Sequence, residues 1–236
     1  MAQPLPSPIP HAWTLPLAIT GRLGDGPGRQ RAMAADGHLL LVLHQPPEPG
    51  RKDRVGRLFW RSPDGFWRDS GGNHGPEEVR RLIDAYRTAV EAIEARIAGD
   101  EASAEACFQA LRAGRPLHRS VRNLHAAVQE ARTLVDDPVL IRLRDAAAGV
   151  ERSVELAMAE AQVGLDYAVA RQVADHGRAQ HRLNILAAIF LPVTAIGTVL
   201  GMNLHSGLEQ GPAVWFWIAT AAAVAAGFVV LAAIRR

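Results

Sequence analysis

Cysteine and lysine are almost missing from this sequence of 236 residues, which contains only Cys107 and Lys52. A single cysteine excludes an intramolecular disulfide and a cysteine-rich zinc site, and it fits a reducing compartment. With one lysine, nearly every basic side chain is an arginine, which keeps its charge at any physiological pH. Basic and acidic residues nearly balance at a formal net charge of +2, so no nucleic-acid partner is expected.

Charge is almost missing from the C-terminal part, where Glu209 is the one charged residue between Leu183 and Ile234. This pattern excludes a wholly soluble enzyme and a disordered tail. The runs Leu183–Leu200 and Ala213–Ile234 are each long enough to cross a bilayer, so they predict two transmembrane helices. The alternative, a buried helical hairpin in a soluble protein, fits the charge-free length less well.

Basic residues flank the two runs on one side only. Arg178 and Arg182 precede the first run and Arg235 and Arg236 follow the second, whereas the connecting loop 201–212 has no Lys or Arg. The positive-inside rule then places both termini in the cytoplasm and this loop outside. The first ten residues agree, because their four prolines come without the basic and apolar segments of a secretory signal peptide.

The polar N-terminal part predicts a small domain with strands first and helices after them. Short apolar runs, with a Ser-Pro-Asp-Gly turn before the last of them, predict strands at 12–19, 38–44, 55–61 and 66–68. Starts at proline and stops at glycine or proline predict the helices that follow. These are 76–98, 102–113 with Gly114 as its end, and a third from Pro116 to a stop before Asp136.

A very long helix is expected next, because no proline interrupts the sequence between Pro138 and Pro192. From Pro138 to about Leu200 it would measure about 95 Å, about three times the hydrocarbon thickness of a bilayer, so its first part is predicted to be a stalk. Spacings of three and four along the stalk require a partner helix. The residues at these spacings are Leu143, Ala147, Val150, Val154, Ala157, Ala161, Gly164 and Ala168. Glu151 and Glu155, on its other faces, are interpreted as solvated.

These elements predict an α+β fold, in which a small N-terminal cytoplasmic domain precedes a long stalk helix that continues into the first of two C-terminal transmembrane helices. The expected division is a disordered Pro-rich tail at 1–10, the α+β domain at 11–137, the stalk at 138–182, the first transmembrane helix at 183–203, the outer loop at 204–212 and the second transmembrane helix at 213–234.

A polar stripe marks the end of the stalk and the first transmembrane helix. Its residues follow one another at spacings of three and four: Gly177, Gln180, Asn184, Ala187, Leu191, Thr194 and Thr198. Polar groups in a membrane helix are costly unless they face a partner or water, so the stripe predicts several copies arranged around a pore. The alternative is that Thr194 and Thr198 bond to carbonyls of their own helix and that Asn184 lies at the interface.

The second transmembrane helix has no such stripe. Ala219, Ala223 and Gly227 form a ridge of small residues, which favours close packing against another helix. We therefore assign this helix to packing and lipid contact.

The first transmembrane helix ends in Gly201-Met202-Asn203. Together with the run Ile185–Ile196, which contains Pro192 and Thr194, this tripeptide resembles the CorA-type magnesium channel family over roughly residues 138–236. The resemblance implies a homopentamer in a bacterial inner (plasma) membrane, with the first transmembrane helices as an inner ring and the second as an outer ring.

The resemblance also implies roles for individual residues. Gly201, Met202 and Asn203 would form the outer selectivity filter, where Asn203 receives the hydrated ion. Leu191 would be a hydrophobic constriction on the pore stripe. His205 and Glu209 lie in the outer loop, where they would face arriving cations.

The sequence departs from the family in places. Leu200 replaces a common tyrosine, the N-terminal domain is short, and the family's magnesium-sensing acids have no clear match. Asp136, Asp137 and Asp145 are the acids available near the foot of the stalk.

The predicted function is a channel or transporter for a divalent cation, Mg²⁺ first with Co²⁺ and Ni²⁺ as further candidates, and with no resident cofactor. One alternative is a zinc transporter of the ZntB-like branch, since the imidazole of His205 suits zinc or nickel better than magnesium. Another is a non-conducting membrane scaffold. An enzyme is not expected, because no nucleophile constellation and no Walker or Rossmann loop is present. His118 and His125, seven residues apart, are interpreted as a surface pair and not as metal ligands.

Overall fold

The computed structural model describes residues 9–10, 12–24, 28–48, 54–99, 103–201, 212 and 214–234. The chain divides into two compact units, Met1–Ala168 and Val169–Arg236, and one helix runs through the boundary. The predicted fold class is confirmed, since a small antiparallel sheet domain precedes a long helix and a second apolar helix. Most of the predicted tail at 1–10 lies outside the described residues.

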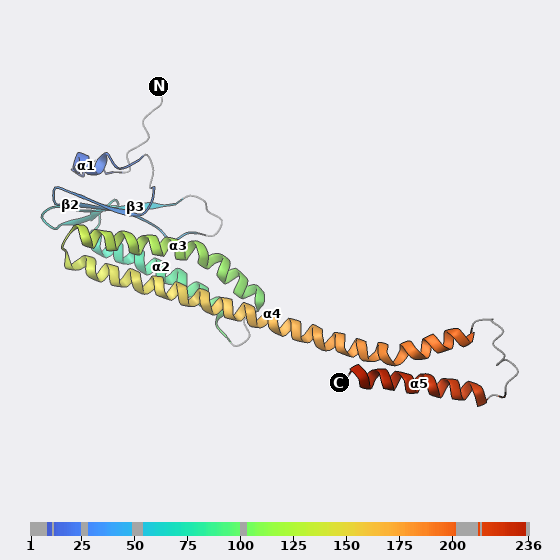
Figure 1. Ribbon diagram of the computed structural model, residues 1–236. Coiled ribbons are helices and arrows are strands. Elements are labelled where there is room, and N and C mark those ends of the chain that lie inside the picture. The colour runs from blue at the N-terminus through green and yellow to red at the C-terminus, as the bar shows by residue number, and fades with distance from the viewer. Residues whose placement is uncertain are drawn as a thin grey trace, which may run out of the picture. The chain divides into compact units, whose positions relative to one another are not determined.

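A four-stranded antiparallel sheet, in the order β1-β2-β3-β4, forms one layer of the N-terminal unit (Figure 1). Its strands are β1 (Arg31–Ala35), β2 (His38–His44), β3 (Gly56–Arg61) and β4 (Trp67–Asp69).

Tight turns pair neighbouring strands. Asp36 and Gly37 both have positive φ, 51° and 76°, as a two-residue hairpin between β1 and β2 requires. In the predicted turn after β3, the Gly65 amide donates to the Ser62 carbonyl at 3.0 Å.

The strand predictions at 38–44, 55–61 and 66–68 are confirmed to within a residue or so. The strand predicted at 12–19 is wrong, because the structure has the short helix α1 (Leu17–Thr20) there and no regular structure at Trp13. Proline at position 16 cannot donate to a sheet, so the apolar side chains of this segment cover the sheet from outside instead. β1 was not predicted, because its alanine-rich sequence carries few strand-forming side chains.

β2 is buried on both of its faces, which explains its unbroken apolar run. Leu39, Leu41 and Leu43 pack in a core with the helices, whereas Leu40 and Val42 pack on the opposite face with Ile19 of α1 and its neighbours. The helices on the first face are α2 (Gly75–Ile97) and α3 (Ala104–Leu134), and α1 lies across the sheet from them (Figure 1).

α3 is one helix, so the prediction of two helices separated at Gly114 and Pro116 is wrong. Gly114 serves close packing and does not end the helix, because a Cβ built on it would lie 2.8 Å from Cγ of Met158. Pro116 is tolerated because buried residues on both sides of it, such as Leu111 and Leu117, hold the helix against the core. Tertiary packing here overrides the local breaker signal.

α4 (Pro138–Gly201) and α5 (Val214–Ile234) agree closely with the two long helices predicted from the sequence. The predicted seam on α4 is confirmed, since its residues from Leu143 to Ala161 are buried in the core that α2, α3 and the sheet share. Farther along, a Cβ on Gly164 would lie 2.9 Å from Sγ of Cys107, so small residues permit close approach there too.

Asp137 anchors the start of α4 to the sheet. Its Oδ1 accepts from the Val139 amide at 2.9 Å, and its Oδ2 accepts from Arg61 Nε at 2.7 Å and from Trp67 Nε1 at 3.2 Å. Burial alone would raise the pKa of Asp137, but these hydrogen bonds and the charge of Arg61 outweigh it and lower the pKa below its ordinary value. The Asp137 carboxylate is therefore a structural group. Asp145, another acid near the foot of the stalk, pairs with Arg144.

We expect Asp137→Asn to destabilise the protein by about 2–3 kcal/mol at neutral pH, because it leaves Arg61 without its charged partner. Since the folded pKa is lowered, this stabilisation is present above the unfolded pKa of about 3.9 and is lost as pH falls through the folded value. Unfolding of the full chain in detergent at neutral and acidic pH measures both effects. Asp145→Asn is the exposed control, with an expected change below about 1 kcal/mol; equal effects of the two variants would contradict the anchor role.

Candidate functional site

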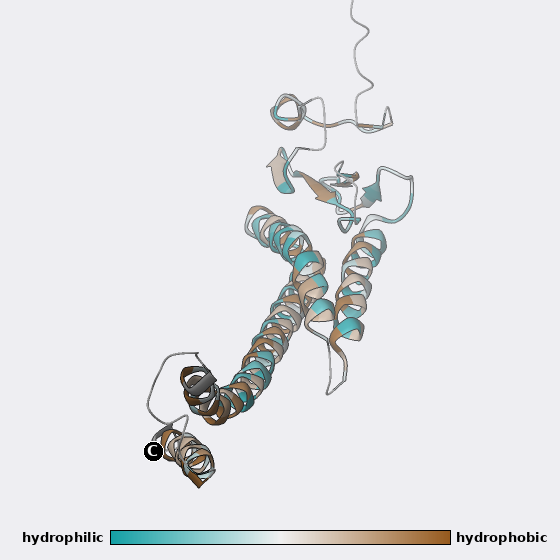
Figure 2. Ribbon diagram, turned by 90° about the vertical axis from the view of Figure 1, so that its right-hand side faces the viewer, coloured by the Kyte–Doolittle hydropathy of each residue, from teal (hydrophilic) through white to brown (hydrophobic). Residues whose placement is uncertain are grey.

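The C-terminal unit presents apolar side chains on its outside. The most apolar 18-residue stretches of α4 and α5 have mean hydropathies of 1.7 and 2.1, yet only 6% and 11% of them is buried within the chain. Both segments are coloured mostly as hydrophobic in Figure 2. A core helix of a soluble protein would be buried, so these two helices do not form the buried hairpin considered as an alternative. Both helices are long and apolar enough to cross a membrane.

The contact between α4 and α5 uses the ridge of small residues predicted on α5. Ala223 and Gly227 are buried and Ala219 is half-buried. A Cβ on Gly227 would lie 3.1 Å from the carbonyl oxygen of Ile189 and 3.3 Å from its Cα, so the backbones of the two helices approach closely at this point. Ala188 of α4 is buried beside it. Close backbone approach over small residues is how membrane helices gain packing energy without a hydrophobic effect between them.

The polar stripe lies on a different face of α4. All seven of its residues, from Gly177 to Thr198, are exposed in the single chain, and Leu191 is 66% exposed. The shielded residues of this segment lie between them: Ala188 is buried, and Ile185, Ile189, Pro192, Val193 and Ile196 are half-buried. The α5 contact therefore leaves the stripe uncovered. Water or another chain can therefore reach the polar groups on this face.

The hydroxyls of the stripe bond to their own helix, which is the alternative weighed from the sequence. Thr194 donates to the Phe190 carbonyl, and Thr198 donates to the Thr194 carbonyl at 2.7 Å. Each hydroxyl oxygen still has lone pairs for accepting a hydrogen bond. The hydrogen bonds within the helix use the threonine hydroxyls as donors and leave their oxygens able to accept. The waters of a hydrated cation are donors, so these oxygens could accept hydrogen bonds from them.

Most of the predicted filter lies outside the described residues. Gly201 is the last residue of α4, while Met202, Asn203, His205 and Glu209 belong to the part that the structure does not describe. Their roles stay predictions.

The structure also brings together residues that the sequence interpretation kept apart. His118 of α3 lies beside Glu151 and Glu155 of α4, with which it forms a group of potential metal ligands. The signal in the sequence was a pair of histidines seven apart and a pair of glutamates four apart, but their alignment depends on the packing of the two helices.

The comparisons with known proteins agree with this fold. The model of the family described as CorA-like Mg²⁺ transporter protein matches residues 30–236. No curated protein matches the chain. Three solved structures are similar. The full-length CmaX protein has a TM-score of 0.66 at 17% identity, covering 88% of this chain and 78% of its own.

The second is the complete CorA magnesium transporter from Methanocaldococcus jannaschii, with a TM-score of 0.60 at 13% identity, covering 88% of this chain and 79% of its own. The third is the ZntB cytoplasmic domain from Vibrio parahaemolyticus, with a TM-score of 0.51 at 14% identity, covering 68% of this chain and 80% of its own. At these identities the likeness shows a shared fold and no more.

We expect Gly227→Ala to lower the stability of the membrane unit, because the added Cβ meets the Ile189 backbone at 3.1 Å and pushes the helices apart. Gly197→Ala is the matched control, since a Cβ there meets nothing within 4 Å, and helix propensity should make it neutral or stabilising by up to about 1 kcal/mol. Thermal unfolding of both variants in detergent tests this. Equal stability of the two variants would show that the close contact between Gly227 and Ile189 does not stabilise the packing of α4 against α5.

Proposed function

The chain belongs to the CorA-like Mg²⁺ transporter family, and from this premise we propose that it is a divalent-cation channel whose pore is lined by several copies of α4. The observation that carries the proposal is the polar stripe, which is exposed on the face of α4 that α5 does not cover. A ring of such helices removes the stripe from lipid and surrounds an axis with hydroxyl and amide oxygens. Five copies are proposed from the family resemblance, with α5 outside the ring in contact with lipid.

Along such an axis the stripe supplies two kinds of surface. Asn184, Thr194 and Thr198 offer oxygen acceptors to the waters of a hydrated ion. Leu191 lies between them, and its exposed side chain would form a ring of apolar groups that dewets a narrow pore. We propose this ring as the gate.

The outer selectivity filter is proposed at Gly201-Met202-Asn203. Magnesium holds its waters tightly and accepts contact through them, so a ring of neutral amide oxygens from Asn203 suits the hydrated ion. Neutral acceptors also bind weakly enough to release the ion, as conduction requires. Glu209 and His205 would attract cations to the entrance. With both termini in the cytoplasm of a bacterial inner membrane, the membrane potential drives entry with about 4.6 kcal/mol per divalent ion at 100 mV.

A zinc transporter is the second candidate. It is supported by the fold shared with the ZntB cytoplasmic domain and by His205 in the outer loop, whose imidazole favours zinc over magnesium. Competition between Mg²⁺ and Zn²⁺ flux in proteoliposomes separates the two transporters. Assembled protein that passes neither ion would instead favour the non-conducting scaffold.

We expect Leu191→Ser to raise leak flux of Mg²⁺ into proteoliposomes several-fold, because serine hydrates the constriction that leucine keeps dry. Leu186→Ser is the matched control, since Leu186 is also exposed but lies off the stripe, and its flux should equal that of the wild type. A Leu191→Ser protein with wild-type flux would move the gate to another position on the stripe.

We expect Asn203→Ala to abolish most divalent flux while leaving assembly intact, because it removes the proposed ion acceptors but neither the α4 seam nor the α4–α5 contact. Block by cobalt hexammine, which mimics hydrated magnesium, should weaken. Asn203→Asp adds charge, so flux should saturate at a lower ion concentration. Size-exclusion chromatography checks assembly. Wild-type flux in an assembled Asn203→Ala protein would refute the filter assignment.

A further inference from the structure

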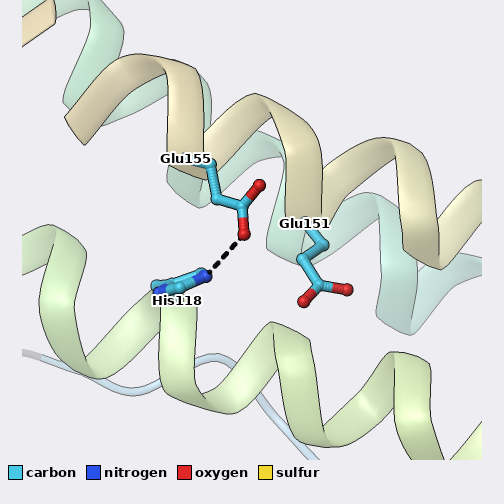
Figure 3. A group of neighbouring side chains, drawn as sticks. All are labelled: His118, Glu151 and Glu155. Atoms are coloured by element: carbon cyan, nitrogen blue, oxygen red, sulfur yellow. Dashed lines mark hydrogen bonds and ion pairs between the residues drawn. The ribbon is translucent and has the colours of Figure 1, made fainter. Parts of the chain in front are cut away.

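A group of histidine and glutamate side chains lies between α3 and α4 in the N-terminal unit, with Glu155 exposed (Figure 3). His118 comes from α3, and Glu151 and Glu155 come from α4; one potential ligand atom from each lies within 4.8 Å of the other two. We propose that these three residues bind a first-row transition metal ion of the zinc class and thereby link α3 to α4. This site is separate from the proposed pore and does not depend on it.

The packing of the two helices fixes the backbone positions of the ligand residues before any ion arrives. Val121 and Leu124 of α3 and Val150 and Val154 of α4 are buried within the same core, and they come from the turns that carry the ligands. The missing Cβ of Gly114 lets Met158 of α4 approach α3 nearby. Ligands fixed on two packed helices need little ordering on binding, which favours affinity.

The distances suit a tetrahedral ion. Nε2 of His118 lies 3.1 Å from Oε1 of Glu155, and all three ligand atoms lie within 4.8 Å of one another. In a tetrahedral zinc site with bonds of about 2.0–2.1 Å, ligand atoms are about 3.4 Å apart. Small rotamer adjustments of the glutamates therefore bring all three atoms into coordination.

A second histidine supports the group from the outside. Nδ1 of His125 lies 2.6 Å from Oε2 of Glu151, so it orients this carboxylate by a hydrogen bond. Partners of this kind position the ligands of natural metal sites. Among the residues that the structure describes, the recorded ion-pair partners of Glu151 and Glu155 are these two histidines, and no arginine occupies the carboxylates.

The donor set selects the kind of metal. Imidazole nitrogen and carboxylate oxygen are both donor types that zinc accepts, and one water would complete a four-coordinate site. Magnesium and calcium prefer oxygen ligands alone, so the imidazole disfavours them. The two carboxylates also balance the charge of a divalent ion. His118 lines a surface pocket together with Arg115, Arg119 and Arg122, so the site is open to solvent but has positive charge beside it.

Zinc binding to the full-length protein in detergent tests the site. We expect Zn²⁺ to raise the Tm of the wild type and of Asn203→Ala and to bind with the affinity of a specific site by calorimetry, whereas Mg²⁺ at the same concentration should not raise the Tm of Asn203→Ala, in which the proposed filter site is removed. His118→Ala and Glu155→Gln should each weaken zinc binding by at least about 10-fold, because loss of a direct ligand should cost no less than loss of an outer-shell partner. Arg122→Gln should tighten binding, since it removes a positive charge one helical turn from His118.

His176→Ala is the matched control, because His176 is an exposed histidine of α4 outside the group, and its zinc affinity should equal that of the wild type. Asn203→Ala should also bind zinc at this site normally, which separates it from the transported ion. Co²⁺ provides a second readout, since its visible spectrum reports four-coordinate geometry and should be lost in His118→Ala. An unchanged zinc affinity in both His118→Ala and Glu155→Gln, or a Tm shift of Asn203→Ala with Mg²⁺ equal to that with Zn²⁺, would overturn the proposal.

Discussion

The single helix α4 lies in two different environments, a protein core along its first part and an exposed apolar stretch along its second. The rest of the structure depends on this constraint. The first part of α4 buries a seam of small and branched side chains, including Ala147, Val154 and Ala161, against the core of the N-terminal unit. Its second part exposes apolar side chains, and no protein core covers them. Burial from water stabilises the first part, whereas lipid must surround the second. Along α4 the sequence therefore changes from a buried seam of small and branched residues to a stretch that is apolar on its outside.

Small residues set the separation of the helices in both units, and this separation decides where functional groups lie. Gly114 and Gly164 let α3 and α4 approach closely, which places histidines of one helix opposite glutamates of the other. Gly227 brings α5 against the backbone of Ile189, which leaves the polar stripe of α4 uncovered. In the N-terminal unit the polar groups lie at the packed interface itself, whereas in the C-terminal unit they lie on the face that the contact leaves uncovered.

Local patterns in the sequence were sufficient for the elements whose neighbours are also local or whose burial is periodic. β2 and β3 follow from short apolar runs, the turn after β3 follows from its turn residues, and α4 and α5 follow from long stretches with few breakers. Where distant contacts decide, the predictions failed. Pro116 and Gly114 are breakers by local rules, yet they lie inside α3 because the core holds the helix on both sides of them. β1 forms because β2 offers it a partner strand, despite its own weak preference.

The sequence by itself determined the two apolar segments, the spacing of the polar stripe, and the tripeptide that follows the first segment, because each is a pattern within one short stretch of the chain. Only the tertiary structure decided which face of α4 meets α5, and that His118 lies beside Glu155 across 37 residues of chain. Helical periodicity states which residues share a face of their own helix. It does not state which face of another helix lies opposite, because that choice is made by side-chain packing between segments far apart in the sequence.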